Sequence, residues 1–262
     1  MPSSTSEPSS RDSGRVSVRS ETGIATLQFG HPKGNSLPGA LLRQMADALD
    51  ALGADPEARV IVLRSNEPGP FCAGASFDEL TSIRDAATGK EFFMGFARLV
   101  LAIRRCPKLI IARVHGKTVG GGVVLAAASD YVIASTSAAV RLSELAVGIG
   151  PFVVGPVIQR KIGLGAFQAL AVDAATWRDA AWAERHGLFA QVTPDGEALD
   201  AAVAALAERL ARSSPDAMAR MKETFWQGTE HWDALLEERA AMSGTLALSP
   251  FTRDAIAAFA AK

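Results

Sequence analysis

Short apolar runs and segments of helical periodicity alternate along the first half of the chain. The runs have the length of buried strands, and the periodic segments carry apolar residues at the spacing of an amphipathic helix. Strands are predicted at residues 16–18, 24–29, 60–63, 109–114 and 130–134, and helices at residues 38–52, 92–103 and 123–129. This alternation is typical of a layered α/β core with crossover connections.

The pattern becomes almost purely helical after about Pro151. Helices are predicted at residues 157–162, 167–172, 179–186, 199–212, 215–225 and 235–248, with one short strand at 189–192. We therefore predict an α/β core over residues 15–195 and a helical C-terminal region over residues 196–262. Residues 1–14 are rich in Ser and Pro and lack an apolar stretch, which predicts a disordered extension rather than a secretory signal.

Composition narrows the classes of function. The 262 residues carry a formal net charge of −1, so neither a nucleic-acid partner nor an anionic membrane surface is expected. No segment approaches the roughly 18 uncharged apolar residues of a membrane span. The two cysteines, Cys72 and Cys106, lack the spacing of a zinc site. We therefore expect free thiols, no metal and a cytoplasmic protein.

Two glycine-containing turns follow predicted strands. Gly120, Gly121 and Gly122 lie where the apolar run 109–114 gives way to a helix, and residues 71–75 follow the run 59–64. Glycine lets a ligand approach the backbone, and the N–H groups at a helix start favour negative charge. Two such turns can supply the two donors of an oxyanion hole. The alternative is that both are merely tight connections between strands and helices.

A candidate acid/base residue follows these turns. Glu144 is the one acid in the apolar stretch 138–150, where burial would raise its pKa toward neutrality. Its structural alternative is an ion pair with Arg141. His115 is a possible alternative base, but a histidine at a strand end more often has a structural role. Cys72 lacks a partner motif for nucleophilic catalysis and is better explained as a small buried thiol.

The segments 33–37 (KGNSL), 71–75 (FCAGA) and 115–122 (HGKTVGGG), followed by Asp130 and Glu144, resemble the crotonase superfamily of enoyl-CoA hydratases and isomerases. This resemblance implies a spiral of β/α turns with a helical C-terminal region used in trimer assembly, commonly as a dimer of trimers. It also implies that an acyl-CoA thioester is the partner. Coenzyme A then enters as part of the substrate, and no separate cofactor is expected.

The resemblance also assigns roles by motif position. The oxyanion N–H groups are those of Ala75 and Gly121, and Glu144 is the catalytic residue. Contacts with the acyl-CoA, largely through the backbone at the two loops, are implied for Lys33, Asn35, Leu37, Phe71, Ala73, Gly120, Val124 and Phe152.

Two positions depart from the family pattern. Ser76 stands where the family usually carries Asp, and Val124 stands where the hydratases carry the first of two glutamates. Hydration needs water to be activated and carbon to be protonated, whereas a 1,3 proton shift needs one base that removes and returns a proton. The single Glu144 therefore predicts an isomerase that converts 3-enoyl-CoA to 2-enoyl-CoA. A 2-enoyl-CoA hydratase and a catalytically weak acyl-CoA-binding homologue are the alternatives.

Overall fold

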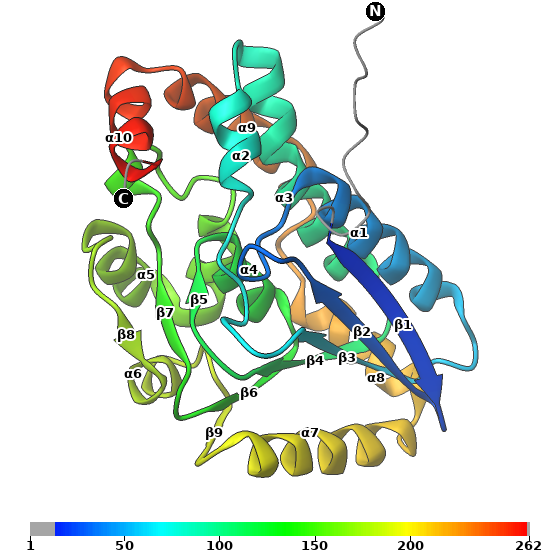
Figure 1. The fold of residues 1–262 in the computed structure, drawn as a ribbon. Coiled ribbons are helices and arrows are strands. Elements are labelled where there is room, and N and C mark those ends of the chain that lie inside the picture. The colour runs from blue at the N-terminus through cyan, green and yellow to red at the C-terminus, as the bar shows by residue number, and fades with distance from the viewer. Residues whose placement is uncertain (1–13, 261–262) are drawn as a thin grey trace, which may run out of the picture.

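A computed structural model describes residues 14–260 of the chain. The predicted disordered extension at residues 1–14 therefore lies almost wholly outside the described residues. The predicted α/β architecture is confirmed, with one large sheet, a small second sheet and helices on both faces of the large sheet (Figure 1).

The large sheet has six strands in the order β1-β2-β3-β4-β6-β9. The first two strands form an antiparallel hairpin, and each later strand pairs in parallel with its neighbour. The strands are β1 (Arg15–Glu21), β2 (Ile24–Gly30), β3 (Val60–Ser65), β4 (Leu109–Val114), β6 (Tyr131–Ser135) and β9 (Gln191–Thr193). Because parallel strands need crossover connections, helices cover the faces of this sheet.

A small second sheet lies beside the large one, in the order β5-β7-β8. Its strands are β5 (Thr118–Val119), β7 (Ala139–Arg141) and β8 (Arg178–Asp179), and the 3₁₀ helix η1 (Leu145–Val147) follows β7. The hydrophobic pattern did not predict this sheet, because strands of two or three residues are too short to show a period of two.

Ten helices occur in the described part of the chain. They are α1 (Gly39–Ala54), α2 (Phe77–Ser82), α3 (Ala86–Arg105), α4 (Gly121–Ala128), α5 (Gly155–Val172), α6 (Ala180–Arg185), α7 (Gly196–Ala211), α8 (Pro215–Phe225), α9 (Trp232–Ala247) and α10 (Pro250–Ala260). The sequence pattern missed α2 and α10. It also divided α5 in two, and the structure places a non-helical residue, Gly163 with φ of 77°, between those two parts.

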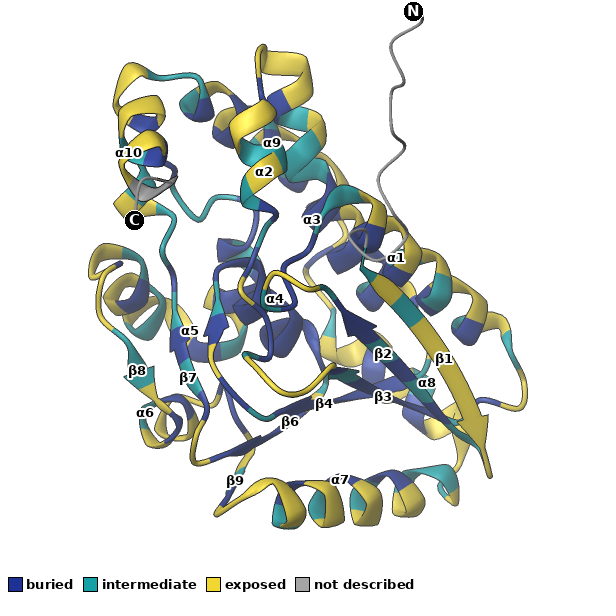
Figure 2. Cartoon of the chain, viewed as in Figure 1, coloured by how far each residue is buried: buried dark blue, intermediate teal, exposed yellow. Residues whose placement is uncertain are grey.

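Helix α7 covers one face of the large sheet, and most other helices lie on the opposite side (Figure 1). The contact between α7 and the sheet is a separate apolar cluster that includes Val60, Ile111, Ile133, Leu199 and Val203. The strands between the two layers are therefore buried on both faces (Figure 2).

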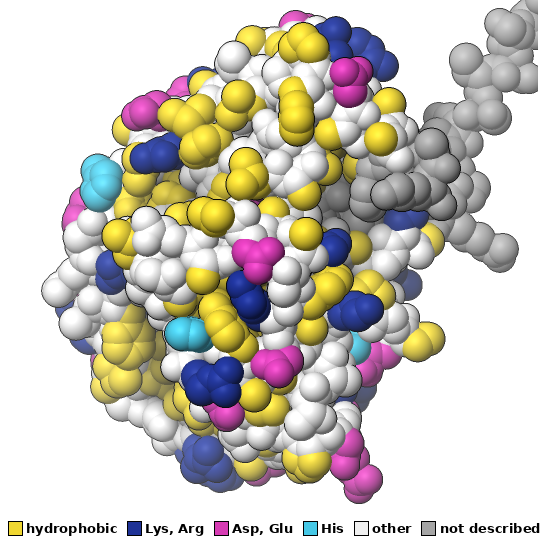
Figure 3. All heavy atoms as spheres, turned by 90° about the vertical axis from the view of Figure 1, so that its left-hand side faces the viewer, with side chains coloured by type: hydrophobic (Ala, Val, Ile, Leu, Met, Phe, Trp, Pro, Cys, Tyr) yellow, Lys and Arg dark blue, Asp and Glu magenta, His cyan; other side chains and the backbone are white. Residues whose placement is uncertain are grey.

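The face that carries α5, α6 and β8 bears acidic and basic side chains in a mixture, with hydrophobic side chains between them (Figure 3). A polyanion is attracted by a continuous positive surface, and the charges on this face are mixed. Within residues 14–260, no helix is long and apolar enough to span a membrane.

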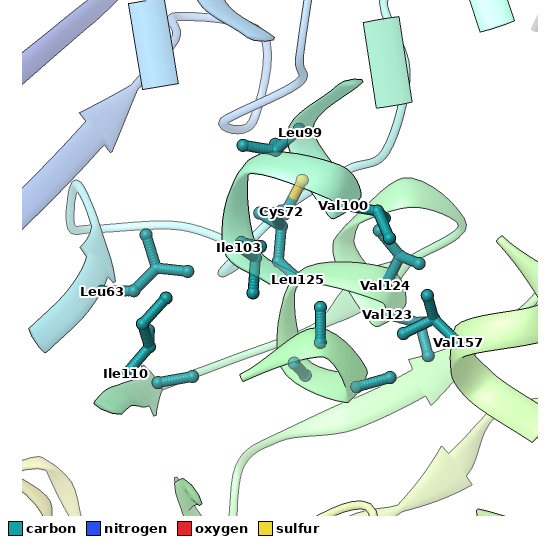
Figure 4. Close-up of a cluster of buried hydrophobic side chains, with 14 of the residues drawn as sticks. Leu63, Cys72, Leu99, Val100, Ile103, Ile110, Val123, Val124, Leu125 and Val157 are labelled. Carbon is teal, nitrogen blue, oxygen red and sulfur yellow. The ribbon is translucent and has the colours of Figure 1, made fainter. Parts of the chain in front are cut away.

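Helix α4 forms the centre of the main core, because all eight of its residues are buried. Its side chains Val123, Val124 and Leu125 pack among residues from α3, α5 and the strands (Figure 4). Such a helix cannot shift without disturbing its whole surroundings, since protein interiors are close-packed. The backbone at its N-terminus is therefore held in a fixed position.

Helices α3 and α9 touch through their backbones. A Cβ atom on Gly89 would lie 2.8 Å from Gly244 Cα, and a Cβ atom on Gly244 would lie 2.5 Å from Lys90 N. Only glycine permits this approach. The close contact brings Ser243 of α9 and the phenylalanines of α3 to a common cavity.

Candidate active site

A cavity of about 700 Å³ lies between the two glycine turns, η1 and helices α2, α3, α9 and α10. Most of its lining is apolar. Seven of the predicted site residues line it: Lys33, Ala73, Ala75, Gly120, Gly121, Glu144 and Phe152. A mostly apolar cavity with a few polar groups is the usual form of a small-molecule site.

The two glycine turns lie side by side because a short parallel bridge joins Cys72 to Thr118. In this bridge the Val119 N–H donates to the Cys72 carbonyl at 2.9 Å. Gly74 has a φ of 91°, and a Cβ atom there would lie 3.0 Å from Val119 O. Glycine is needed at residue 74 both for this conformation and for the close approach of the second turn.

Each residue of the triple glycine meets a different neighbour. Gly120 has a φ of 50°, and a Cβ atom on it would lie 3.1 Å from Glu144 Oε1. A Cβ atom on Gly121 would overlap the Phe96 ring at 2.1 Å, and one on Gly122 would lie 2.7 Å from Cys72 Cβ. The three glycines therefore bring the backbone against a carboxylate, an aromatic ring and the first turn.

Two residues of these turns, Ala75 and Gly121, line the cavity and carry backbone donors. Gly121 is the first residue of α4, where an N–H has no partner within its own helix. Ala75 follows Gly74, whose carbonyl accepts from the Leu37 N–H at 2.8 Å. Among residues 14–260, no backbone carbonyl outside the regular elements accepts from the N–H of Ala75 or Gly121. This arrangement can stabilise an oxyanion in the cavity.

Glu144 supplies an acid/base group beside these donors. The residue is half-buried, but its Oε2 atom is buried and has no hydrogen-bond partner. Burial raises the pKa of Glu144 to about 7. Its backbone is fixed, since its carbonyl accepts from Ile149 N at 2.9 Å. A carboxylate with a pKa near neutrality can both accept and return a proton.

The ion pair between Glu144 and Arg141, which the sequence left open, does not form. The Arg141 guanidinium instead lies over the Trp177 ring, 4.6 Å from its centroid. Within the described residues, no cationic side chain forms an ion pair with Glu144. Within the described residues, no ion pair therefore lowers the pKa of Glu144 against the effect of burial.

His115 and Cys72 do not line the cavity. The His115 Nε2 atom lies 3.1 Å from Gly69 O, and burial lowers the pKa of this histidine. Cys72 is fully buried, and burial raises the pKa of its thiol to about 12. The interpretation of Cys72 as a small buried thiol is confirmed. The structural role of His115 stays a prediction, since its buried Nδ1 atom has no hydrogen-bond partner within the described residues. No group of three or more metal-ligating side chains occurs within residues 14–260.

Four predicted substrate-binding residues lie outside the cavity lining: Asn35, Leu37, Phe71 and Val124. Leu37, Phe71 and Val124 are fully buried. The Asn35 side chain donates to the carbonyls of Asn66 and Pro70 at 2.8 and 2.9 Å. These residues support the loops and the helix behind the site instead of forming its surface. Lys33 does line the cavity, and its ammonium group pairs with Asp78.

The apolar walls of the cavity were not identified from the sequence. Their residues come from separate elements: Leu80 of α2, Phe92, Phe93 and Phe96 of α3, and Ala255 and Ala258 of α10. The phenylalanines were visible only as one face of an amphipathic helix. The serine at position 76 does not disturb the first turn, since its hydroxyl accepts from Glu79 N at 3.4 Å and caps α2.

Known proteins are similar to this chain in sequence and in fold. A sequence profile of the enoyl-CoA hydratase/isomerase family matches residues 19–258. The chain belongs to this family. The resemblance noted in the sequence is thereby confirmed, and the protein is an acyl-CoA-processing enzyme of the enoyl-CoA hydratase/isomerase family.

Two relatives and one solved structure illustrate the match. Methylglutaconyl-CoA hydratase from Rattus norvegicus is 33% identical over 213 residues, which cover 79% of this chain and 67% of that protein. A protein from Rhizobium meliloti, named probable enoyl-CoA hydratase, is 32% identical over 94% of both chains. The crystal structure of an enoyl-CoA hydratase from Mycobacterium avium has a TM-score of 0.83 and 28% identity, covering 94% of this chain and 96% of that one. The crotonase fold is confirmed by this likeness.

Proposed function

We propose that this family member is an enoyl-CoA isomerase that moves the double bond of a 3-enoyl-CoA to the 2-position. The observation that carries the proposal is a single buried carboxylate, Glu144, beside the backbone N–H groups of Ala75 and Gly121 in one apolar cavity. Among the described residues, Glu144 is the one carboxylate that lines this cavity.

The reaction follows from these groups. The thioester oxygen accepts hydrogen bonds from the N–H groups of Ala75 and Gly121. Glu144 removes a proton from the α carbon, and the electrons move onto the thioester oxygen to give a dienolate, which the two donors stabilise. The protonated Glu144 then returns the same proton to the γ carbon, so the carboxylate is regenerated and no water is consumed. Phe152 and the α3 phenylalanines exclude water from the base.

Hydration of 2-enoyl-CoA is the second candidate, and the names of relatives such as methylglutaconyl-CoA hydratase favour it. Hydration requires one group to activate water and another to protonate carbon. Val124 is fully buried in α4 and cannot titrate. A binding protein with weak activity is the third candidate, and the free donors beside an unpaired base argue against it.

A panel of 2-enoyl-, 3-enoyl- and 3-hydroxyacyl-CoA esters tests the proposal. We expect acetoacetyl-CoA to bind in calorimetry, and we expect isomerisation of 3-enoyl-CoA to be faster than hydration of 2-enoyl-CoA, with products separated by chromatography. Faster hydration would show that the single-base mechanism is wrong. No detectable binding of any ester at high concentration would contradict the whole acyl-CoA assignment.

We also propose a homotrimer or hexamer. Large apolar side chains that are exposed in the single chain support assembly, with Val172 at 74%, Phe251 at 68% and Leu164 at 54% exposure. Light scattering at micromolar concentration is expected to give a trimeric or hexameric mass, and a monomeric mass would contradict the proposal.

A cytoplasmic location is proposed on the two free, buried cysteines.

A further inference from the structure

Two cations share one aromatic ring beside the cavity. The Arg141 guanidinium lies 4.6 Å from the centroid of the Trp177 ring, and the Lys117 ammonium lies 5.2 Å from it. The ring therefore collects two positive charges, and an anion near them would be attracted.

The register of the small sheet places Arg141 on its cavity side. Thr118 of β5 pairs with Val140 of β7, and both side chains are fully buried in the core. The next pair is Val119 and Arg141. Because successive side chains of a strand point to opposite faces, Val119 and Arg141 both point away from that core. Both residues line the cavity.

No carboxylate neutralises this pair of cations. Within the described residues, neither Arg141 nor Lys117 forms an ion pair, and the buried Nε atom of Arg141 has no hydrogen-bond partner. The neighbouring Arg178, by contrast, pairs with Asp173 at 2.9 Å. A half-buried cation loses hydration, and within the described residues the Trp177 ring is the one partner found for the Arg141 guanidinium. An anionic ligand would compensate this loss.

We propose that Arg141 binds a carboxylate at the distal end of the acyl group. The substrate class is then the CoA monothioester of an unsaturated dicarboxylic acid. This proposal rests on the proposed function, in which the thioester lies at Ala75 and Gly121. The planar guanidinium can hold a carboxylate through two parallel N–H···O bonds, and stacking on Trp177 fixes its plane before the ligand arrives.

The position of Arg141 favours an acyl carboxylate over a phosphate of coenzyme A. The Arg141 carbonyl accepts from the Gly120 N–H at 3.0 Å, so Arg141 is joined directly to the turn that carries the Gly121 donor. The Arg141 side chain therefore begins beside the turn that carries the Gly121 donor, and both residues line the same cavity. The phosphates of coenzyme A are separated from the thioester by the whole pantetheine arm.

Two substrates that differ in one group test the site. One is an enoyl-CoA with a terminal carboxylate, and the other carries a methyl group in place of that carboxylate. In the wild-type protein we expect kcat/KM to be at least about 10-fold higher for the carboxylated ester. Arg141→Gln is expected to lower kcat/KM for this ester by about 10- to 100-fold, the range for loss of a charge-assisted hydrogen bond. The loss for the methyl-terminated ester is expected to be at least about tenfold smaller.

Two variants and one further substrate complete the experiment. Arg141→Lys keeps the positive charge but loses the two parallel N–H donors of the guanidinium. It should therefore be more active on the carboxylated ester than Arg141→Gln. Arg178→Gln is the matched control, since Arg178 lies outside the lining, and it should leave the preference unchanged. Pantetheine thioesters, which lack the nucleotide, should show the same Arg141→Gln effect.

The outcomes separate the two proposals. Equal losses on both esters, or no preference in the wild-type protein, would overturn the carboxylate site while leaving the isomerase intact. An Arg141→Gln effect that disappears with pantetheine esters would assign Arg141 to a coenzyme A phosphate and overturn the proposal. Failure of the wild-type protein to bind either ester in calorimetry would overturn the proposed function together with the site.

Discussion

Replacement of Glu144 by glutamine is expected to lower kcat for isomerisation by about 10²- to 10⁴-fold, the contribution of a general acid/base residue. The amide keeps the shape of the carboxylate but cannot accept the proton from the α carbon. Thioester binding should change little, because the donors at Ala75 and Gly121 remain. Steady-state rates with 3-enoyl-CoA and calorimetry with acetoacetyl-CoA measure the two effects separately.

Glu79→Gln is a suitable control for this variant. Glu79 lies outside the cavity lining, where its carboxylate accepts from Gly39 N at 2.8 Å, so its loss should not lower kcat by more than a few-fold. Full activity in folded Glu144→Gln would remove Glu144 from the mechanism. Loss of binding together with activity would assign it to positioning of the thioester.

The pH dependence of the wild-type enzyme tests the same carboxylate. Only the ionised form of Glu144 can remove a proton, and burial raises its pKa to about 7. We therefore expect kcat/KM to rise with pH up to about 7 and then to level off. An acid limb near the ordinary value of 4.5 would show that the base is a solvated carboxylate. The limb should be absent from the residual rate of Glu144→Gln.

Long, strongly periodic elements could be predicted from the sequence. The strand at residues 109–114 and the helix at residues 215–225 have the predicted bounds, as β4 and α8. Both signals are local, since a buried strand is apolar along its length and Pro215 begins the helix after its cap Ser214. The elements that were missed depend on tertiary contacts. The strands β5 and β8 have two residues each and exist because β7 lies between them.

The parts of the site that could be predicted are those marked by residue types along the chain. The two glycine turns and Glu144 line one cavity, as expected from their residue types. The side chains of Asn35, Leu37, Phe71 and Val124 lie behind the cavity lining, because a motif shows which residues surround a site but not which side chains turn toward it. The walls from α3, α9 and α10 come from segments far apart in the sequence, which no local pattern brings together.

The burial of Val124 bears on the choice between isomerase and hydratase. Its side chain lies beside Val100 in the main core and is fully buried (Figure 4). A carboxylate at this position would need a polar partner that the surrounding apolar residues do not offer. The apolar surroundings of position 124 therefore suit valine and do not suit a second acid. This consistency favours a mechanism in which Glu144 alone moves the proton.

Replacement of Gly121 by proline is expected to lower kcat by more than about 100-fold, which is what loss of one oxyanion donor costs. Proline has no N–H, and it is tolerated at the first position of a helix, where Gly121 lies. The added ring atoms also press on Phe96, since a Cβ atom on Gly121 would lie 2.1 Å from Phe96 Cε1.

Gly121→Ala is therefore the matched control, because it adds the Cβ atom but keeps the donor. We expect the alanine variant to retain at least about tenfold more activity than the proline variant, and making both in a Phe96→Leu background should widen the gap by relieving the clash. Equal losses in the two variants, measured on folded protein with 3-enoyl-CoA, would show that steric pressure rather than the missing N–H lowers the rate, and would exclude Gly121 as an oxyanion donor.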